Sequence, residues 1–334
     1  MRSETLDLLR FPLALVIVIV HALPLAPSPS IMDGLIMAFL KEQSVPIYYF
    51  ISGYVFFLGI ELTKGVYLKK IKNRIRTLLI PYLIWNLLFF VYNSINGSIC
   101  KVEDFFKSFW CIYTDISNKT YPVDYPLWFL RDLMIVVLCT PLVNKLIKNF
   151  RYNYIILVGV VWFLANILSW GRLAQFASAF FFFSFGAYMS INKKDIIQEF
   201  GKYSTLSIFL FIFLGCCYMV LFRIMPDVAH AIMFARVLVG LVFAYNISAL
   251  LLRRGYCKVN KFLAQSSFFI YLSHVFFLGR FHRLIFNIID TNSAFGIIVG
   301  QVMAVVVTVF MLLFLYCCGK RFVPVLFKVM IGGR

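Results

Sequence analysis

The sequence predicts an all-α, polytopic membrane protein, and three observations lead to that fold class. The 334 residues are 62% hydrophobic, with a mean hydropathy of +0.89, and only 14% of them are charged. Apolar stretches long enough to cross a bilayer as helices recur along the whole chain. The net charge of +18 comes from lysines and arginines that lie mostly in short connections between those stretches. This distribution indicates membrane topology and argues against a nucleic-acid partner.

The apolar pattern predicts about ten transmembrane helices in a single domain over residues 1–334, with a short cytoplasmic tail from about 319. The expected spans lie near 6–26, 35–60, 76–96, 127–147, 154–170, 173–191, 204–222, 231–252, 262–286 and 295–318. Pro46 and Gly53 interrupt the second span, which predicts either a kink or a separate piece before it.

The basic residues alternate between the two sides of the membrane. Clusters precede the third span and follow the fourth, sixth and eighth spans, and the two ends of the chain are basic as well. Because cytoplasmic connections are enriched in Lys and Arg, both termini are expected in the cytoplasm.

The longest polar connection, from about Gly97 to Pro126, then lies outside the cell. It mixes aromatic with acidic residues, which suits sugar recognition and equally an aromatic belt at the membrane surface. Cys100 and Cys111 share this connection and could form a disulfide in an oxidising compartment. The cysteines show no metal-ligand pattern, and no metal is expected.

The first span carries two ionisable residues that an ordinary lipid-facing helix would lack. Arg10 lies near its cytoplasmic end and His21 well inside it, on nearly the same helix face and about 16 Å apart along the axis. An ionisable residue inside a membrane span is costly and therefore indicates a functional site. His21 is the first candidate for a catalytic residue.

Later spans add further polar residues. Arg74 and Arg76 lie at the cytoplasmic start of the third span, Arg131 and Asp132 in the outer part of the fourth, and His274 near the middle of the ninth. Each has a structural alternative: Arg76 as a topology anchor, His274 as a hydrogen-bonding residue between helices, and the Arg131–Asp132 pair as an ion pair with other spans.

This arrangement suits an acyl donor with a phosphate-rich head and a narrow arm, the shape of acyl-coenzyme A. Arginine binds phosphate bidentately, so the predicted donor-binding residues are Arg10, Arg74 and Arg76, with Tyr82 and Trp85 in the same third span. The arm could reach towards His21, a histidine being well suited to removing a proton from a hydroxyl near neutral pH. The candidates for orienting His21 are Asp7, Asp132 and His274, and supporting roles are expected for Ser52, Tyr54, Trp128 and Arg131.

Six motifs in order resemble the integral-membrane acyltransferase 3 family over about residues 10–285. They read ETLDLLRFPLALVIVIVH, VPIYYFISGYVFF, KNRIRTLLIPYLIWNLL, LWFLRDLMIV, FFFSFGAYMS and SSFFIYLSHVFF. The resemblance implies O-acyl transfer, commonly of acetyl from acetyl-coenzyme A, to sugars of surface polysaccharides or lipid-linked glycans at the bacterial cell membrane. It also implies that His21 is the catalytic residue, Arg10 its paired motif residue and Arg74 part of the basic motif before the third span. The fourth-span run differs from that of relatives with a fused domain, which leaves the role of Asp132 open.

The expected function is thus that of a membrane O-acetyltransferase with a carbohydrate acceptor. An exporter or flippase of glycans, or of their lipid-linked precursors, is the alternative, because intramembrane Arg and His also line transport pathways.

Overall fold

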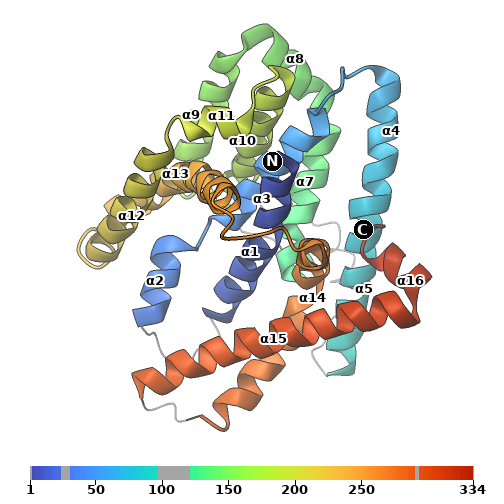
Figure 1. The fold of residues 1–334 in the computed structure, drawn as a ribbon, viewed down its shortest axis with the longest axis vertical. Helices are drawn as coiled ribbons and strands as arrows, with labels where there is room; N and C mark the ends of the chain where they lie inside the picture. The colour runs from blue at the N-terminus through green and yellow to red at the C-terminus, as the bar shows by residue number, and fades with distance from the viewer. Residues whose placement is uncertain (1, 24–30, 97–120, 290–292, 334) are drawn as a thin grey trace. The chain divides into compact units, whose positions relative to one another are not determined.

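The computed structural model describes residues 2–23, 31–96, 121–289 and 293–333, and these residues are helical with no strand among them (Figure 1). Most of the expected outer connection, including Cys100 and Cys111, lies outside the described residues. The chain divides into two compact units. Unit 1 comprises residues 1–44 and 196–324, unit 2 comprises residues 45–195 and 325–334, and each is described by itself.

Unit 1 is built around its first helix, α1 (Arg2–Ala22), which packs against α13, α14 and α15. Leu6, Leu9, Leu13 and Ile17 are buried at the three- and four-residue spacing of one helix face. The other helices of unit 1 are α2 (Ile31–Phe39), α11 (Ile196–Gly201), α12 (Ser204–Leu221), α13 (Pro226–Arg253), α14 (Lys261–Phe286) and α15 (Ala294–Phe322).

Unit 2 contains the middle of the chain and its last helix. Its elements are α3 (Ser44–Phe57), whose first residue closes unit 1, α4 (Lys64–Arg74), the π-helical η2 (Ile75–Leu79), α5 (Ile80–Ile95), the 3-10 turn η3 (Tyr125–Leu127), α7 (Trp128–Leu138), α8 (Thr140–Phe150), α9 (Tyr152–Ile167), α10 (Arg172–Ile191) and α16 (Pro324–Met330).

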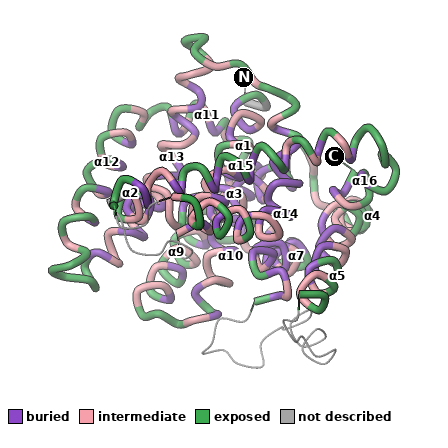
Figure 2. The backbone as a smooth tube through the Cα atoms, turned by 90° about the horizontal axis from the view of Figure 1, so that it is seen from below, coloured by how far each residue is buried: buried purple, intermediate pink, exposed green. Residues whose placement is uncertain are grey.

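Seven of the described helices are long and apolar enough to cross a membrane, or eight if one bent pair counts as a span. Large apolar side chains on α12 and α15 are exposed, among them Phe209, Phe213, Phe310 and Phe314. Figure 2 shows α12 with many exposed residues, whereas α14 is largely buried or intermediate. Exposed apolar helix faces of this extent are typical of helices that contact membrane lipid. The chain is therefore a membrane protein whose described residues form helices and no strands. A count of about ten spans and the cytoplasmic position of both termini stay predictions.

The second expected span is two helices. α2 ends at Phe39 and α3 begins at Ser44. Glu42 between them has a φ of 63°, which a continuous right-handed α-helix does not allow. The separate preceding piece expected from the sequence is present, but the break lies before Pro46 and Gly53. Pro46 is tolerated in the first turn of α3 because its missing N–H would have no partner there.

Gly53 instead marks a close helix crossing within unit 2. A Cβ at Gly53 would overlap the backbone carbonyl of Phe183 on α10, and a Cβ at Gly186 would overlap that of Phe50 on α3. The rings of Phe50 and Phe185 meet edge-on at 5.2 Å beside this crossing. Reciprocal glycines let two membrane helices approach backbone to backbone.

The fourth expected span is bent. α7 and α8 meet at an angle of 61°, and the second residue of α8 is Pro141. Because proline has no N–H, it cannot bond the carbonyl of Val137, and the Thr140 hydroxyl donates to that carbonyl instead at 2.7 Å. The local sequence thus explains the bend.

The third expected span begins earlier than predicted. α4, η2 and α5 form one 32-residue helix from Lys64 to Ile95, about 48 Å long, whereas a hydrocarbon core is about 30 Å thick. The basic residues before the span therefore lie on a helix and not in a loop. The π-helical turn carries Arg76, follows Arg74 and precedes Pro81, and such turns often occur at functional sites.

The residues expected as a tail from about 319 are ordered. α15 continues to Phe322, and α16 follows with Phe327 and Ile331 buried. Within unit 2, the indole Nε1 of Trp85 donates to the carbonyl of Met330 at 3.0 Å. The end of the chain therefore packs on the long helix of the third span.

Candidate active site

The centre of unit 1 holds a pair of histidines. His21 occupies the last turn of α1, and His274 lies on α14, which packs along α1. His274 Nε2 lies 3.1 Å from His21 Nδ1, and the ring centroids are 5.0 Å apart. His274 is completely buried, and His21 is half-buried. The structure thus brings together two of the predicted site residues from opposite ends of the chain.

The hydrogen bonds assign the tautomer of each ring. His274 Nδ1 lies 2.9 Å from the carbonyl of Tyr271 and must donate to it, so its Nε2 is an acceptor. His21 Nδ1 lies 2.9 Å from the carbonyl of Ile17, so this nitrogen is assigned the ring hydrogen. The same N–H faces His274 Nε2, which accepts. In the neutral His21 ring the basic lone pair is therefore on Nε2.

This is the arrangement that a general base needs. A base is effective when a second group fixes its orientation through the other ring nitrogen and stabilises the imidazolium that forms. His274 contacts His21 in that manner. Asp7, one of the other candidates for orienting His21, is instead bound at the far end of the same helix.

Arg10 and Asp7 form an ion pair on α1. Arg10 Nη1 lies 2.8 Å from Asp7 Oδ1, and their side chains are 46% and 38% exposed. A partly exposed pair one turn apart contributes little to stability. Arg10 is therefore an accessible cation, separated from His21 by about 16 Å of helix.

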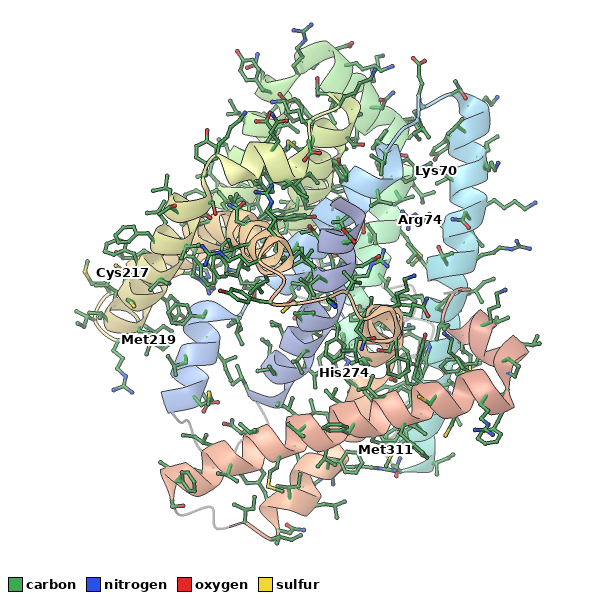
Figure 3. All side chains as sticks on the ribbon, viewed as in Figure 1. Lys70, Arg74, Cys217, Met219, His274 and Met311 are labelled. Atoms are coloured by element: carbon green, nitrogen blue, oxygen red, sulfur yellow. The ribbon has the colours of Figure 1, made fainter. Side chains whose placement is uncertain are left out.

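The other predicted donor-binding residues share the long helix of unit 2. Arg74 is half-buried and Arg76 exposed, whereas Tyr82 and Trp85 are buried. Lys70, one turn before Arg74 (Figure 3), donates to the carbonyl of Phe56 and lies 5.0 Å from its ring. Arg74 and Arg76 thus lie along one helix, and Trp85 of the same helix donates to the carbonyl of Met330 near the end of the chain.

The predicted supporting residues divide by burial. Tyr54 on α3 is buried, while Ser52 on α3 and Trp128 at the start of α7 are half-buried. The supporting roles of these three residues stay predictions.

Arg131 and Asp132 belong to a buried ionic cluster in unit 2. Asp132 Oδ1 accepts from Arg172 Nη2 at 2.6 Å and from Arg131 Nε at 3.2 Å, and Arg172 Nη1 donates to Gln175 Oε1 at 2.6 Å. All three charged side chains are at most 1% exposed. Asp132 Oδ2 has no hydrogen-bond partner in the described part of the chain. The expected ion pair with another span is present, and its partner is Arg172 of α10.

A second buried acid, Asp124, lies just before η3. Its backbone N–H donates to Asn86 Oδ1 at 3.0 Å, and no described residue forms a hydrogen bond with its own Oδ2. Asn86 is anchored in turn by donating to the carbonyl of Tyr82 at 2.8 Å. Burial raises the pKa of the Asp124 carboxyl well above its ordinary value.

Replacing Asp124 by Asn should therefore stabilise the protein at neutral pH. A raised native pKa means that ionisation, which begins above the unfolded pKa of about 3.9, costs folding free energy, and an amide cannot ionise. The gain in unfolding temperature should be absent near pH 3 and should grow as the pH rises through the native pKa. Thermal unfolding of the solubilised protein measures it, with Asp195→Asn at an exposed position as the control. A lower unfolding temperature at pH 7 would contradict the prediction.

Arg172 and Gln175 were missed from the sequence, and Asp124 was counted only among the acidic residues of the outer connection. Arg172 falls between the expected spans 154–170 and 173–191, yet it is the first residue of α10 and fully buried. The available signal was Gly171, which has a φ of 52° and lets the helix begin directly at the arginine.

Comparison with known proteins agrees with this architecture. The family model described as an acyltransferase domain, Acyl_transf_3, matches residues 4–318. The chain therefore belongs to this family of membrane acyltransferases.

One curated relative is the succinoglycan biosynthesis protein ExoH of Rhizobium meliloti (strain 1021), which is 31% identical over 211 residues. That match covers 58% of this chain and 55% of the relative, so the chain spans just over half the length of the relative it matches. No solved structure gives a significant match.

Proposed function

We propose that this chain is a membrane O-acetyltransferase that moves an acetyl group from acetyl-coenzyme A to a hydroxyl of a surface polysaccharide, lipid-linked glycan or related sugar. The observation that supports it most directly is the His21–His274 contact, which gives the half-buried His21 a fixed tautomer and a basic Nε2. Membership of the acyltransferase family and the likeness to a protein of succinoglycan biosynthesis support the reaction type and the kind of acceptor.

In the proposed reaction, His21 Nε2 removes the proton of the acceptor hydroxyl. The oxygen attacks the thioester carbonyl carbon, the carbon–sulfur bond breaks, and the thiolate takes the proton from the His21 imidazolium. His274 holds the Nδ1–H of His21 throughout and is a positioning residue.

The donor head is proposed to bind to arginines at the cytoplasmic side. Arg10 is the candidate phosphate ligand of unit 1, and Arg74 and Arg76 are those of unit 2, with Tyr82 and Trp85 supporting the same helix. Because Arg10 stands about three helical turns from His21, a pantetheine-like arm bound along α1 would extend over a comparable length.

The test combines an assay of the purified full-length protein with glycan analysis. Acetyl-coenzyme A should be consumed with release of the free thiol, and release should increase when an oligosaccharide acceptor is present. Mass spectrometry of surface glycans from cells with and without the gene should differ by one acetyl mass. If the glycans are lost from the surface without a change in mass, and no thiol is released, the exporter alternative is correct and the proposal is wrong.

A further inference from the structure

A second polar site lies inside unit 1, around Arg236 in the first half of α13. The Arg236 side chain is completely buried, and its Nη2 donates to the backbone carbonyl of Lys41 at 2.9 Å. Its Nε and Nη1 have no hydrogen-bond partner among the residues that the structure describes. A guanidinium inside a membrane helix with unused donors is costly, and such residues usually face a ligand or pathway.

Two more unpartnered polar side chains come from the break between α2 and α3. Both amide atoms of Gln43 and the hydroxyl of Ser44 are buried, and within the described part of the chain they have no hydrogen-bond partner. Gly240, one turn after Arg236 on α13, lies directly against Gln43, because a Cβ at this glycine would overlap Gln43 Oε1. The Gln43 amide therefore lies on the same stretch of α13 as the arginine.

The backbone at this place is irregular. Lys41 and Glu42 join the two helices, and Glu42 adopts a φ of 63°. Interrupted helices at membrane depth are tolerated where their backbone is buried in protein or lines a binding cavity, and transporters use such breaks as substrate sites. Arg236 donates through Nη2 to the carbonyl of Lys41 in this connection, and its Nε and Nη1 remain available for a ligand.

The charge of the site defines the ligand. Glu42 lies within electrostatic range of Arg236 but is exposed, and no ion pair among the described residues includes this arginine. The ring of Phe211 lies with its centre 5.9 Å from the guanidinium carbon, and Tyr218 is also within electrostatic range. One buried positive charge beside a neutral amide and a hydroxyl matches a single negative charge on two oxygens. A phosphate dianion would leave one charge unbalanced.

We propose that Arg236, Gln43 and Ser44 form a carboxylate-binding site in the interior of unit 1. The inference rests on the proposed acyl-transfer function for its role: the carboxylate would belong either to the far end of a dicarboxylic acyl group on the donor or to an acidic sugar of the acceptor. The same chemistry recognises both, and substrate selectivity is the expected consequence.

The direct test is ligand binding by the purified full-length protein, followed by its thermal unfolding. Malonate can place one of its two carboxylates in the site and leave the other outside it, so it should raise the unfolding temperature. Malonamide, which has the same shape without the charge, should not. In Gln43→Glu the new carboxylate pairs with Arg236 and occupies the site, so the malonate effect should disappear while the protein remains folded. This variant avoids the problem that Arg236→Gln removes the bond to Lys41 as well.

Two glycine variants supply a matched pair. Gly240→Ala displaces the Gln43 amide, which is the end of a flexible side chain, and should weaken the malonate effect at least severalfold. Gly279→Ala on α14 adds the same methyl group where nothing lies within 4 Å and should leave it intact.

The source of the carboxylate follows from activity ratios. If Gln43→Glu lowers the preference for malonyl- over acetyl-coenzyme A by about tenfold or more, the site binds the donor. If it instead lowers the preference for a uronic-acid over a neutral oligosaccharide by a similar factor, the site binds the acceptor. Absence of a malonate effect in the wild-type protein, or its persistence in Gln43→Glu, would overturn the proposal. A protein that binds malonate but releases thiol from no acyl-coenzyme A would refute the proposed function and leave this site standing.

Discussion

Replacing His21 by Asn is expected to lower the rate of acyl transfer by about 10²–10⁴-fold, the usual contribution of a general base. The Asn amide nitrogen can take the place of Nδ1 and keep the bonds towards Ile17 and His274, but it offers no base at the position of Nε2. The initial rate of thiol release at saturating acetyl-coenzyme A and acceptor measures the loss. His230→Asn, the same substitution at a half-buried position of α13, should retain the wild-type rate.

The double variant tests whether His274 acts through His21. If His274 only positions the base, His274→Asn should slow the wild-type enzyme strongly but add little to His21→Asn. His274→Gln should be milder, because its amide oxygen can accept from His21 Nδ1 as Nε2 does. Independent, additive losses, or equal losses for Gln and Asn, would assign His274 to packing alone.

The sequence allowed His21 to be singled out because a titratable group in a long apolar helix is visible without a fold. Its neighbour could not be chosen in the same way. Asp7, Asp132 and His274 were all chemically suitable, and only the packing of α1 on α14 places His274 at 3.1 Å. Asp7 pairs with Arg10 instead, on the same helix, where no folding could bring it to His21.

The helical class and most span positions could be predicted because they depend on hydrophobicity summed over many residues. The position of the break in the second span, at Lys41 and Glu42, could not, since neither residue is a strong helix breaker and the apolar pattern continues on both sides. Arg172 was missed for a related reason, because an arginine at the edge of an apolar run reads as a topology signal. Arg236 lies inside the expected span 231–252 and was given no role, because the burial of its side chain depends on tertiary contacts.

Replacing Asp132 by Asn should destabilise the protein by about 3–5 kcal/mol, the usual cost of removing one partner from a buried ion cluster. The substitution preserves the shape of the side chain but leaves Arg131 and Arg172, both essentially unexposed, without the carboxylate between them. Thermal unfolding of the solubilised protein should show a large fall. Glu199→Gln, which removes a surface pair with Lys202, should have little effect, because exposed pairs contribute little.

A triple variant separates stability from function. Replacing Arg131, Asp132 and Arg172 together by apolar residues of similar size removes every buried charge of the cluster and should recover much of the stability lost in Asp132→Asn. If the cluster only supports the fold, activity should return with stability. Asp132 Oδ2 has no hydrogen-bond partner in residues 2–23, 31–96, 121–289 and 293–333. If it accepts a hydrogen bond from the acceptor sugar, the stable triple variant should remain inactive with a raised KM for the acceptor. A stable, fully active triple variant would remove Asp132 from the proposed catalytic residues and leave His21 and His274 as the chemical centre.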